Sequence, residues 1–219
     1  MRLFVEDYEP ARLPATLPAT MEIRPFRMED RDAVADVIAR AFRDNPAMIG
    51  VIGADGDTRE RALRAFAGAL IPVYLKHGEV WVAREASAVR AATLSLPPGR
   101  YPLPPLADLR LFWAALRHGG PGVAMRFARS DAVLRQHHLQ TPHHYLFMIG
   151  TDPQWQGRGL GSALLKRLTA DAADAPCYLE TDKRTSVQLY ERHGFQTGAE
   201  ADLLDGQGAF HVWFMRRAA

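Results

Sequence analysis

The sequence predicts an α/β fold with a mixed sheet of about seven strands flanked by helices, and three observations carry this prediction. Two strand patterns form a hairpin early in the chain. Strand and helix patterns then alternate in its last third. The 219 residues are 47% hydrophobic and 24% charged, a composition typical of a folded globular protein. An early antiparallel pair followed by strand–helix–strand units indicates one mixed sheet.

The first half of the chain supplies a strand, two helices and the hairpin. Residues 22–26 read as a short strand, and Asp30 as the N-cap of a helix that ends at Asn45-Pro46. The apolar positions of this helix have helical spacing: Val34, Val37, Ile38, Ala41 and Phe42. A second helix is expected after Thr58, followed by hairpin strands that begin at residue 80 and cover residues 89–96.

The second half begins with a helical insertion before the fourth strand. Prolines make residues 97–105 an irregular loop, and two helices are expected at 106–116 and 123–139. The remaining elements alternate: strand 144–150, helix 159–171, strand 177–180, helix 185–193, a strand from residue 195 and a strand at 210–215. Residues 1–20, which include the repeat LPATLPAT, are expected to be an extended tail in front of a single domain at 21–219.

Charge, hydropathy and cysteine content exclude several classes of protein. The formal net charge of +2 is too small to indicate a nucleic-acid-binding surface. The sequence has no apolar run long enough to span a membrane and no signal-peptide pattern at its start, so we expect a cytoplasmic protein without a membrane partner. The single cysteine, Cys177, cannot form an internal disulfide, and we expect it to pack in a strand.

A glycine-rich segment follows the apolar strand that ends at Gly150. It reads TDPQWQGRGLGS from Thr151 to Ser162 and leads into an amphipathic helix. Alternating glycines let a backbone approach an anion closely, and a helix N-terminus adds partial positive charge. This pattern predicts a pyrophosphate site, with the Arg158 guanidinium beside it. A dinucleotide-binding oxidoreductase is an alternative, because the segment nearly meets G-x-G-x-x-G, although five residues separate it from the strand.

A second motif surrounds Tyr190. The segment TSVQLYERHGF, from Thr185 to Phe195, reads as a short helix that Gly194 ends in left-handed geometry. Tyr190 is then either a core residue of the last helical turns or an acid that protonates a leaving group. The residues alone leave both interpretations open.

Together the two motifs resemble motifs A and B of the GNAT superfamily of acyl-CoA-dependent N-acetyltransferases, in the branch that includes puromycin N-acetyltransferase. The resemblance implies the GNAT fold, acetyl-CoA as co-substrate, and Tyr190 as the general acid for the departing thiolate. It also implies a coenzyme site. Its expected residues are Ile149, Gly150, Thr151, Gln156, Gly157, Arg158, Gly159, Leu160, Gly161, Ser162 and Ser186. Ser186 stands where relatives often have asparagine.

Acetyl transfer to an alkyl amine needs a base, because the amine has a pKa near that of lysine, about 10.4. Glu180, at the end of a strand, is the candidate, although it also fits a solvated strand-end acid. A free backbone N–H of Ile149 or Gly150, where the fourth and fifth strands splay, would stabilise the developing oxyanion. Cys177 is not expected to be a nucleophile.

Four histidines, His137, His138, His143 and His144, raise the question of a metal site. Neighbouring histidines point apart and no Cys, Asp or Glu lies among them, so we expect pocket or surface roles and no metal. Tyr101, Phe112 and Trp113 are candidates for the wall of an acceptor pocket, or for core positions.

The sequence therefore predicts an N-acetyltransferase that acts on a primary amine of a small molecule. The alternative is a non-catalytic acyl-CoA-binding sensor on the same fold. A homodimer through the last strands is also expected.

Overall fold

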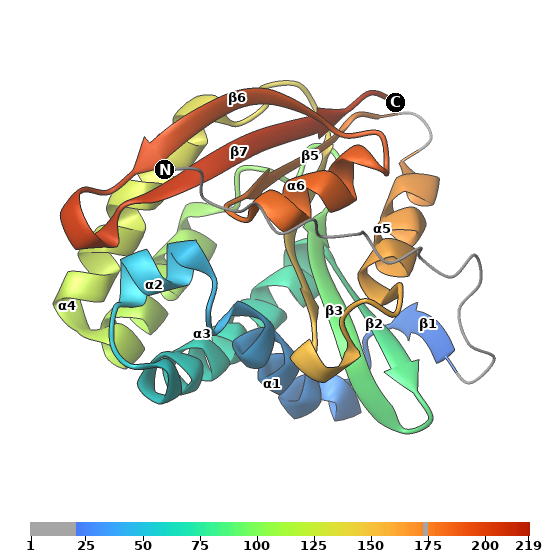
Figure 1. Ribbon diagram of the computed structural model, residues 1–219, viewed down its shortest axis with the longest axis horizontal. Helices are drawn as coiled ribbons and strands as arrows, with labels where there is room; N and C mark the ends of the chain where they lie inside the picture. Colours follow the sequence, from blue (N-terminus) through green and yellow to red (C-terminus); the bar gives the residue numbers. More distant parts are fainter. Residues whose placement is uncertain (1–20, 173–174) are drawn as a thin grey trace, which may run out of the picture.

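The computed structural model describes residues 21–172 and 175–219, and the predicted tail at residues 1–20 lies outside them. Within these ranges seven strands form one sheet in the order β1-β2-β3-β4-β5-β7-β6 (Figure 1). Their bounds are β1 Met21–Pro25, β2 Glu79–Glu85, β3 Ala88–Leu96, β4 His144–Thr151, β5 Cys177–Thr181, β6 Gln196–Leu203 and β7 Phe210–Arg217. The prediction of a seven-stranded mixed sheet is confirmed, since β4 and β5 pair in parallel and the other neighbours pair antiparallel.

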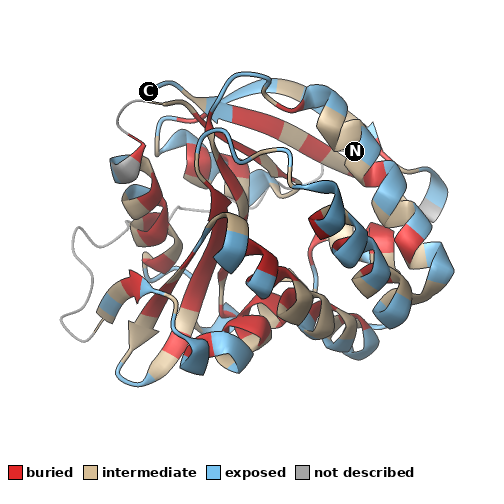
Figure 2. Cartoon of the chain, turned by 180° about the vertical axis from the view of Figure 1, so that it is seen from behind, coloured by how far each residue is buried: buried red, intermediate tan, exposed pale blue. Residues whose placement is uncertain are grey.

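Helices cover both faces of the sheet. Their bounds are α1 Arg31–Phe42, α2 Pro46–Ile52, α3 Gly56–His77, α4 Pro105–His137, α5 Leu160–Asp171 and α6 Arg184–Glu191. One core cluster joins α1, α3 and α4 to the sheet, and a second joins α5 and α6 to β5 and β7. Buried residues follow the strands and the inner sides of the helices, whereas the outer helix surfaces are exposed (Figure 2).

The insertion before β4 differs from its prediction. The two expected helices form one element, α4, which is broken at Gly120, where φ is 81° and ψ is 177°, just before Pro121. It ends at His137 rather than at residue 139, and His138 already has an extended backbone. The short helix α2 was not predicted. It begins at Pro46, where Asn45 accepts a hydrogen bond from the Met48 amide at 3.3 Å, so Asn45-Pro46 starts a helix as well as ending one.

Asp30 precedes α1 as predicted, but its carboxylate does not cap the helix. Both oxygens accept from the buried Arg24 guanidinium, at 2.7 and 2.9 Å, and one also accepts from the Arg27 amide at 2.8 Å. Burial alone would raise the pKa of Asp30, but these hydrogen bonds outweigh it and hold the pKa below the ordinary value of 3.8. The pair joins β1 to the start of α1.

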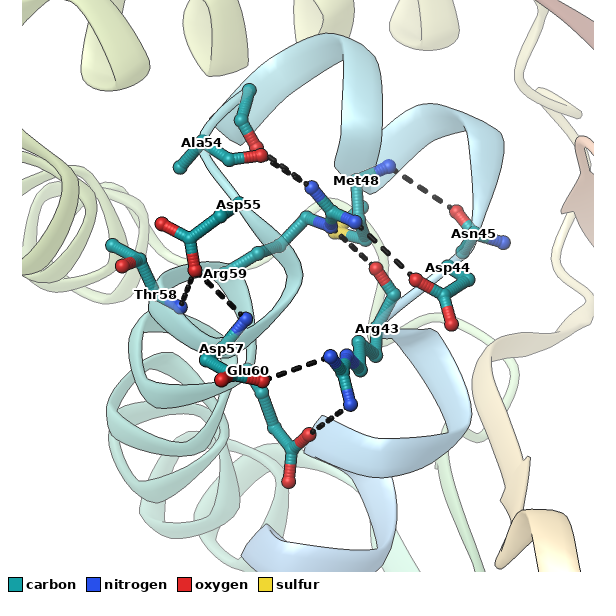
Figure 3. Close-up of polar contacts among 11 residues, drawn as sticks. Arg43, Asp44, Asn45, Met48, Ala54, Asp55, Asp57, Thr58, Arg59 and Glu60 are labelled. Carbon is teal, nitrogen blue, oxygen red and sulfur yellow. Dashed lines mark hydrogen bonds and ion pairs between the residues drawn. The ribbon is translucent and has the colours of Figure 1, made fainter.

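A buried arginine fixes the turns between α1, α2 and α3 (Figure 3). Arg59 donates to the backbone carbonyls of Arg43, Gly53 and Ala54, the last two at 2.8 Å. These carbonyls lie in tight turns that have no regular secondary structure to satisfy them. Arg59, on α3, therefore holds in place the turns at both ends of α2. This short helix lies beside the site described below.

The pairing between β4 and β5 stops after three residues of each strand. His144 pairs with Cys177, Tyr145 with Tyr178, and Leu146 with Leu179, and no pair follows. On its other side, β4 has a bulge against β3 between Met148 and Leu146. Such a bulge bends a strand. The two halves of the sheet diverge from Phe147 and Glu180 onward, as expected from the sequence (Figure 1).

Three further expectations concern the chain as a whole. Within the described ranges no helix is both long and apolar enough to cross a bilayer. β6 lies at one edge of the sheet, and a homodimer through the last strands stays a prediction. The single domain over residues 21–219 also stays a prediction.

We expect Asp30→Ala to lower the free energy of unfolding by about 3–5 kcal/mol, because it leaves the Arg24 charge buried without a partner. Asp36→Ala is the matched control, since it removes an exposed ion pair with Arg64 and should cost less than about 1 kcal/mol. Denaturant unfolding of both variants measures the difference. The native contribution of Asp30 should be complete above pH 3.8 and be lost as the pH falls below that value. Equal losses in the two variants would contradict the assignment.

Candidate active site

The loop from β4 to α5 is fixed at its start by Asp152. The buried carboxylate accepts from Arg40 at 2.7 Å and from the Gln154 amide at 3.2 Å, and the Asp152 amide donates to the Arg90 carbonyl at 2.8 Å. Pro153 then opens a short 3-10 turn, Pro153–Trp155. These contacts set the direction in which the glycine segment leaves the sheet.

The glycines shape the rest of this loop. Gly157 and Gly159 have φ values of 75° and 83°, which a residue with a side chain adopts only at a cost. A Cβ added at Gly157 would meet no atom within 4 Å, so this position faces open space. Gly159 is the N-cap of α5, whose first amides have no acceptor within the helix. The loop therefore presents bare backbone and free N–H groups to the cavity beside it.

This first cavity, of about 370 Å³, brings together the predicted site residues with one exception. Those that line it are Ile149, Gly150, Thr151, Gln156, Gly157, Gly159, Leu160, Gly161, Ser162, Glu180, Ser186 and Tyr190. The Ser162 hydroxyl is already paired with His193 Nε2 at 2.5 Å, so the part of Ser162 left for a ligand is its backbone amide.

Arg158 is the exception. Its guanidinium stacks on the Trp155 ring at 4.2 Å from the ring centre, where Arg90 also stacks at 4.3 Å. The cations that do line the cavity, Lys183 and Arg192, were missed. They flank α6, and a signal was available because Lys183 lies two residues before the second motif and Arg192 lies within it.

Tyr190 is a core residue, as one of the two interpretations predicts, and its role as an acid stays a prediction. Its ring is buried against Phe195, with ring centres 5.9 Å apart, and the residue also lines the first cavity. Gly194 has the predicted left-handed geometry, with φ of 83°, and the Tyr190 carbonyl accepts from the His193 and Phe195 amides. Burial raises the pKa of Tyr190, so the hydroxyl keeps its proton at neutral pH. The negative charge of Asp182 raises the pKa of Tyr190 further.

A second cavity, of about 610 Å³, adjoins the first. The two share wall residues from α1, the turn after it, β4 and the end of β5: Phe42, Asn45, Phe147, Met148, Glu180, Thr181 and Asp182. They meet where β4 and β5 diverge. Tyr101 and Phe112 line the second cavity as predicted, whereas Trp113 is 58% exposed and does not line it.

Two carboxylates lie at the junction of the cavities, and their partners distinguish them. Asp182 accepts from the Asn45 side chain at 2.7 Å and from the Ala47 amide at 2.5 Å, so both of its oxygens hold the start of α2 in place. Glu180 instead faces His138, with 3.2 Å between Oε1 and Nδ1. Both oxygens of Asp182 are thereby occupied within the fold, whereas Glu180 contacts an ionisable side chain; its role as a base stays a prediction.

The partners of Glu180 form a chain of hydrogen bonds that sequence reasoning missed. His143 Nδ1 lies 2.7 Å from the Thr141 carbonyl, which can only accept, so this nitrogen carries a proton. Burial lowers the pKa of His143 below 6.5, so the ring is neutral at pH 7 and its Nε2 accepts. His138 Nε2, at 3.0 Å, must then donate to it.

This series of hydrogen bonds sets how many protons the Glu180–His138 pair holds. With Nε2 of His138 already a donor, its Nδ1 hydrogen-bonds to Glu180 only if one further proton lies between them. The pair sits in an aromatic cage: His138 stacks on Tyr101 with ring centres 3.5 Å apart and meets Tyr145 and Tyr178 edge-on. In the part of the chain that the structure describes, no group of three His, Cys, Asp or Glu side chains is arranged to hold a metal.

The fold and the site together define the class of protein. Residues 108–197 match the family model described as an acetyltransferase (GNAT) domain. A solved structure from Corynebacterium glutamicum, described as histone acetyltransferase HPA2 and related acetyltransferase, superposes with a TM-score of 0.69 at 26% identity, over 91% of this chain and 97% of that one. An agmatine N-acetyltransferase superposes with a TM-score of 0.56 at 16% identity, over 91% and 100% of the two chains, which is a likeness of fold.

Curated relatives match over shorter segments. A mycothiol acetyltransferase from Mycolicibacterium gilvum is 42% identical over 60 residues, 23% of this chain and 20% of the relative. The N-alpha-acetyltransferase RimI from Mycobacterium tuberculosis is 46% identical over 50 residues, 22% and 32% of the two chains. The chain thus spans less than a third of the length of these relatives. Residues 108–197 are thus similar to a GNAT acetyltransferase domain, and the described residues have the fold of the acetyltransferase structures above; membership of the puromycin N-acetyltransferase branch stays a prediction.

We expect imidazole nitrogen–proton correlation spectra at pH 7 to show protons on His143 Nδ1 and His138 Nε2. A second proton on His138 Nδ1 would place the extra proton of the pair on the imidazole, and its absence would place it on Glu180. In Glu180→Gln the extra proton should be lost, because the amide donates to His138 Nδ1 itself. A His138 ring protonated at Nδ1 alone in the unsubstituted protein would contradict the chain of hydrogen bonds.

Proposed function

We propose that this protein transfers the acetyl group of acetyl-CoA directly to a primary amine of a small molecule. One observation carries the proposal. A cavity lined by a glycine-rich helix N-terminus and a tyrosine meets a second cavity at a carboxylate, where two strands diverge. A thioester donor in the first cavity and an amine in the second would meet at that junction.

The first cavity suits the phosphates of a coenzyme. The open backbone at Gly157 and the free amides of α5 would hold a pyrophosphate, and Lys183 and Arg192 add positive charge to the wall of the same cavity. The β4 segment from Ile149 to Thr151 lines the same cavity, beyond the pairs with β5, and supports the expected contact with the pantetheine arm. Ser186 lines the α6 side.

The junction supplies the acid and the base. Glu180, whose side chain is one-tenth exposed, would act as a carboxylate, with the extra proton of its pair on His138, and take a proton from the ammonium group so that the amine nitrogen can attack the thioester carbonyl. The C–N bond forms, the C–S bond breaks, and the buried Tyr190 hydroxyl would donate its proton to the departing sulfur; the second proton that the amine nitrogen loses on becoming an amide would restore this hydroxyl. A backbone N–H of Ile149 or Gly150 would stabilise the oxyanion in between.

We expect Tyr190→Phe to lower kcat with an accepted amine by about 100-fold or more, because the departing thiolate loses its proton donor. The Kd of acetyl-CoA should stay within about twofold of its native value, because the aromatic ring is retained. A twofold change corresponds to only about 0.4 kcal/mol of binding free energy. Thiol release measures the rate and calorimetry the affinity. Unchanged turnover would overturn the assignment of Tyr190 as the acid.

We expect Gly157→Ala to weaken acetyl-CoA binding by about tenfold or more, because the added methyl group points into the open space beside the loop, at a residue that lines the first cavity. Gly206→Ala is the matched control: Gly206 also has positive φ, at 62°, and open space around its Cα, but lies in the turn before β7. Calorimetry with acetyl-CoA, NAD and NADP separates the functions. Preference for a dinucleotide would refute the proposal, and tight acetyl-CoA binding without transfer to any of a broad panel of amines would favour the sensor.

A further inference from the structure

We propose that the acceptor is a primary amine with a bulky apolar body, rather than a polyamine or an amino acid. The inference rests on the proposed function and deepens it, because it concerns what the second cavity would hold while its amine reaches Glu180. Cavity size, wall chemistry and charge each support it.

The second cavity is large and its walls are mostly apolar. Its volume of about 610 Å³ is within the range of pockets that enclose drug-sized molecules. Aromatic and aliphatic side chains from α3, α4 and the strands form most of the surface, among them Phe66, Leu111, Phe127 and Phe210. A ligand that fills such a space gains by removing apolar surface from water.

The charged groups of the second cavity favour one cation and disfavour an anion. Asp108, Asp131, Glu180 and Asp182 line it against Arg135 and His138. Arg135 donates to Asp108 at 3.0 Å and to Asp131 at 2.6 Å, which leaves one negative charge in that group. An acceptor carboxylate would meet this excess of negative charge, so an amino acid fits poorly.

A second ammonium group, as in a polyamine, fits poorly for another reason. Both carboxylates, Asp108 and Asp131, already accept from Arg135, so a second ammonium would have to share their oxygens with that guanidinium and would find no free carboxylate. Burying such a charge is costly. A neutral polar group on the apolar body of the acceptor could hydrogen-bond to Ser130. This residue lines the cavity and is 6% exposed, and its hydroxyl has no hydrogen-bond partner within the described residues.

The cavity wall on α4 reaches the surface at Phe112. This side chain is 36% exposed and lines the cavity, whereas its neighbour Trp113 is 58% exposed and does not. The two aromatic residues share a helix and an exposed setting, so they form a matched pair for testing whether the apolar wall contacts the acceptor.

The first experiment compares three amines with the same four-carbon chain: 4-phenylbutylamine, butylamine and 1,4-diaminobutane. With saturating acetyl-CoA, kcat/KM from thiol release should be about tenfold or more higher for 4-phenylbutylamine than for either of the others. Equal or better use of 1,4-diaminobutane would overturn the proposed class while leaving the proposed function intact.

Binding distinguishes the two proposals if no amine is acetylated. Calorimetric binding of 4-phenylbutylamine, but not of 1,4-diaminobutane, would support the apolar ligand class and count against the transfer reaction. Absence of binding by 4-phenylbutylamine would overturn the class.

The second experiment uses the matched pair. Phe112→Lys should raise the KM for 4-phenylbutylamine by about tenfold, because it places a charge on the apolar wall, and Trp113→Lys should change it by less than about twofold. The KM for acetyl-CoA should be unchanged in both variants, which shows that the fold is retained. Equal effects of the two substitutions on the amine KM would overturn the assignment of the acceptor to this cavity.

Discussion

The divergence of β4 and β5 is the constraint on which the rest of this structure depends. The two strands pair in parallel only from His144 to Leu146 and from Cys177 to Leu179, and β4 is bulged just beyond that point. A sheet that continued its ladder would bury the backbone groups of Phe147 to Thr151 in hydrogen bonds with β5 and leave no space between the strands. Because the ladder stops, both cavities open at the same place, and Glu180 becomes the first β5 residue beyond the pairing. The position of the proposed active site, at the junction of the two cavities, thus follows from the backbone pairing of the sheet.

A gap between strands is useful only if its walls are held, and buried polar contacts do this on the α1–α3 side. Asp182, two residues beyond Glu180, binds Asn45 and the Ala47 amide, which ties the start of α2 to the end of β5. Arg59 binds backbone carbonyls in the turns before and after α2 and so fixes both ends of this helix. Each contact satisfies backbone or carboxylate groups that would otherwise be buried without partners, and such groups are costly to leave unpaired. The same contacts that stabilise the fold therefore keep the wall of the junction in one position.

The sequence predicted best what depends on a few neighbouring residues. The left-handed Gly194 at the end of α6 and the start of α5 are local consequences of glycine placement, and the strands of the sheet follow from runs of apolar residues. It did not predict what depends on distant segments. His138 and Glu180 are 42 residues apart and Asn45 and Asp182 are 137 apart, so their pairing exists only after the sheet forms. Arg158 was chosen over Lys183 and Arg192 because it is adjacent to the glycines in sequence, whereas a cavity wall is assembled from both of its sides.

The acid and the base proposed for this site require opposite protonation states in surroundings of similar polarity. Burial favours the neutral form of any ionisable group, so it suffices to keep the proton on Tyr190, which needs no partner to act as a donor. A carboxylate in the same setting would carry an uncompensated charge at high cost. Glu180 avoids that cost through the proton it shares with His138, whose ring is in turn oriented by His143 and the Thr141 carbonyl. The histidine pair is thus what allows a carboxylate to stand beside an apolar cavity, and it links the chemistry at the junction to the choice of an apolar acceptor.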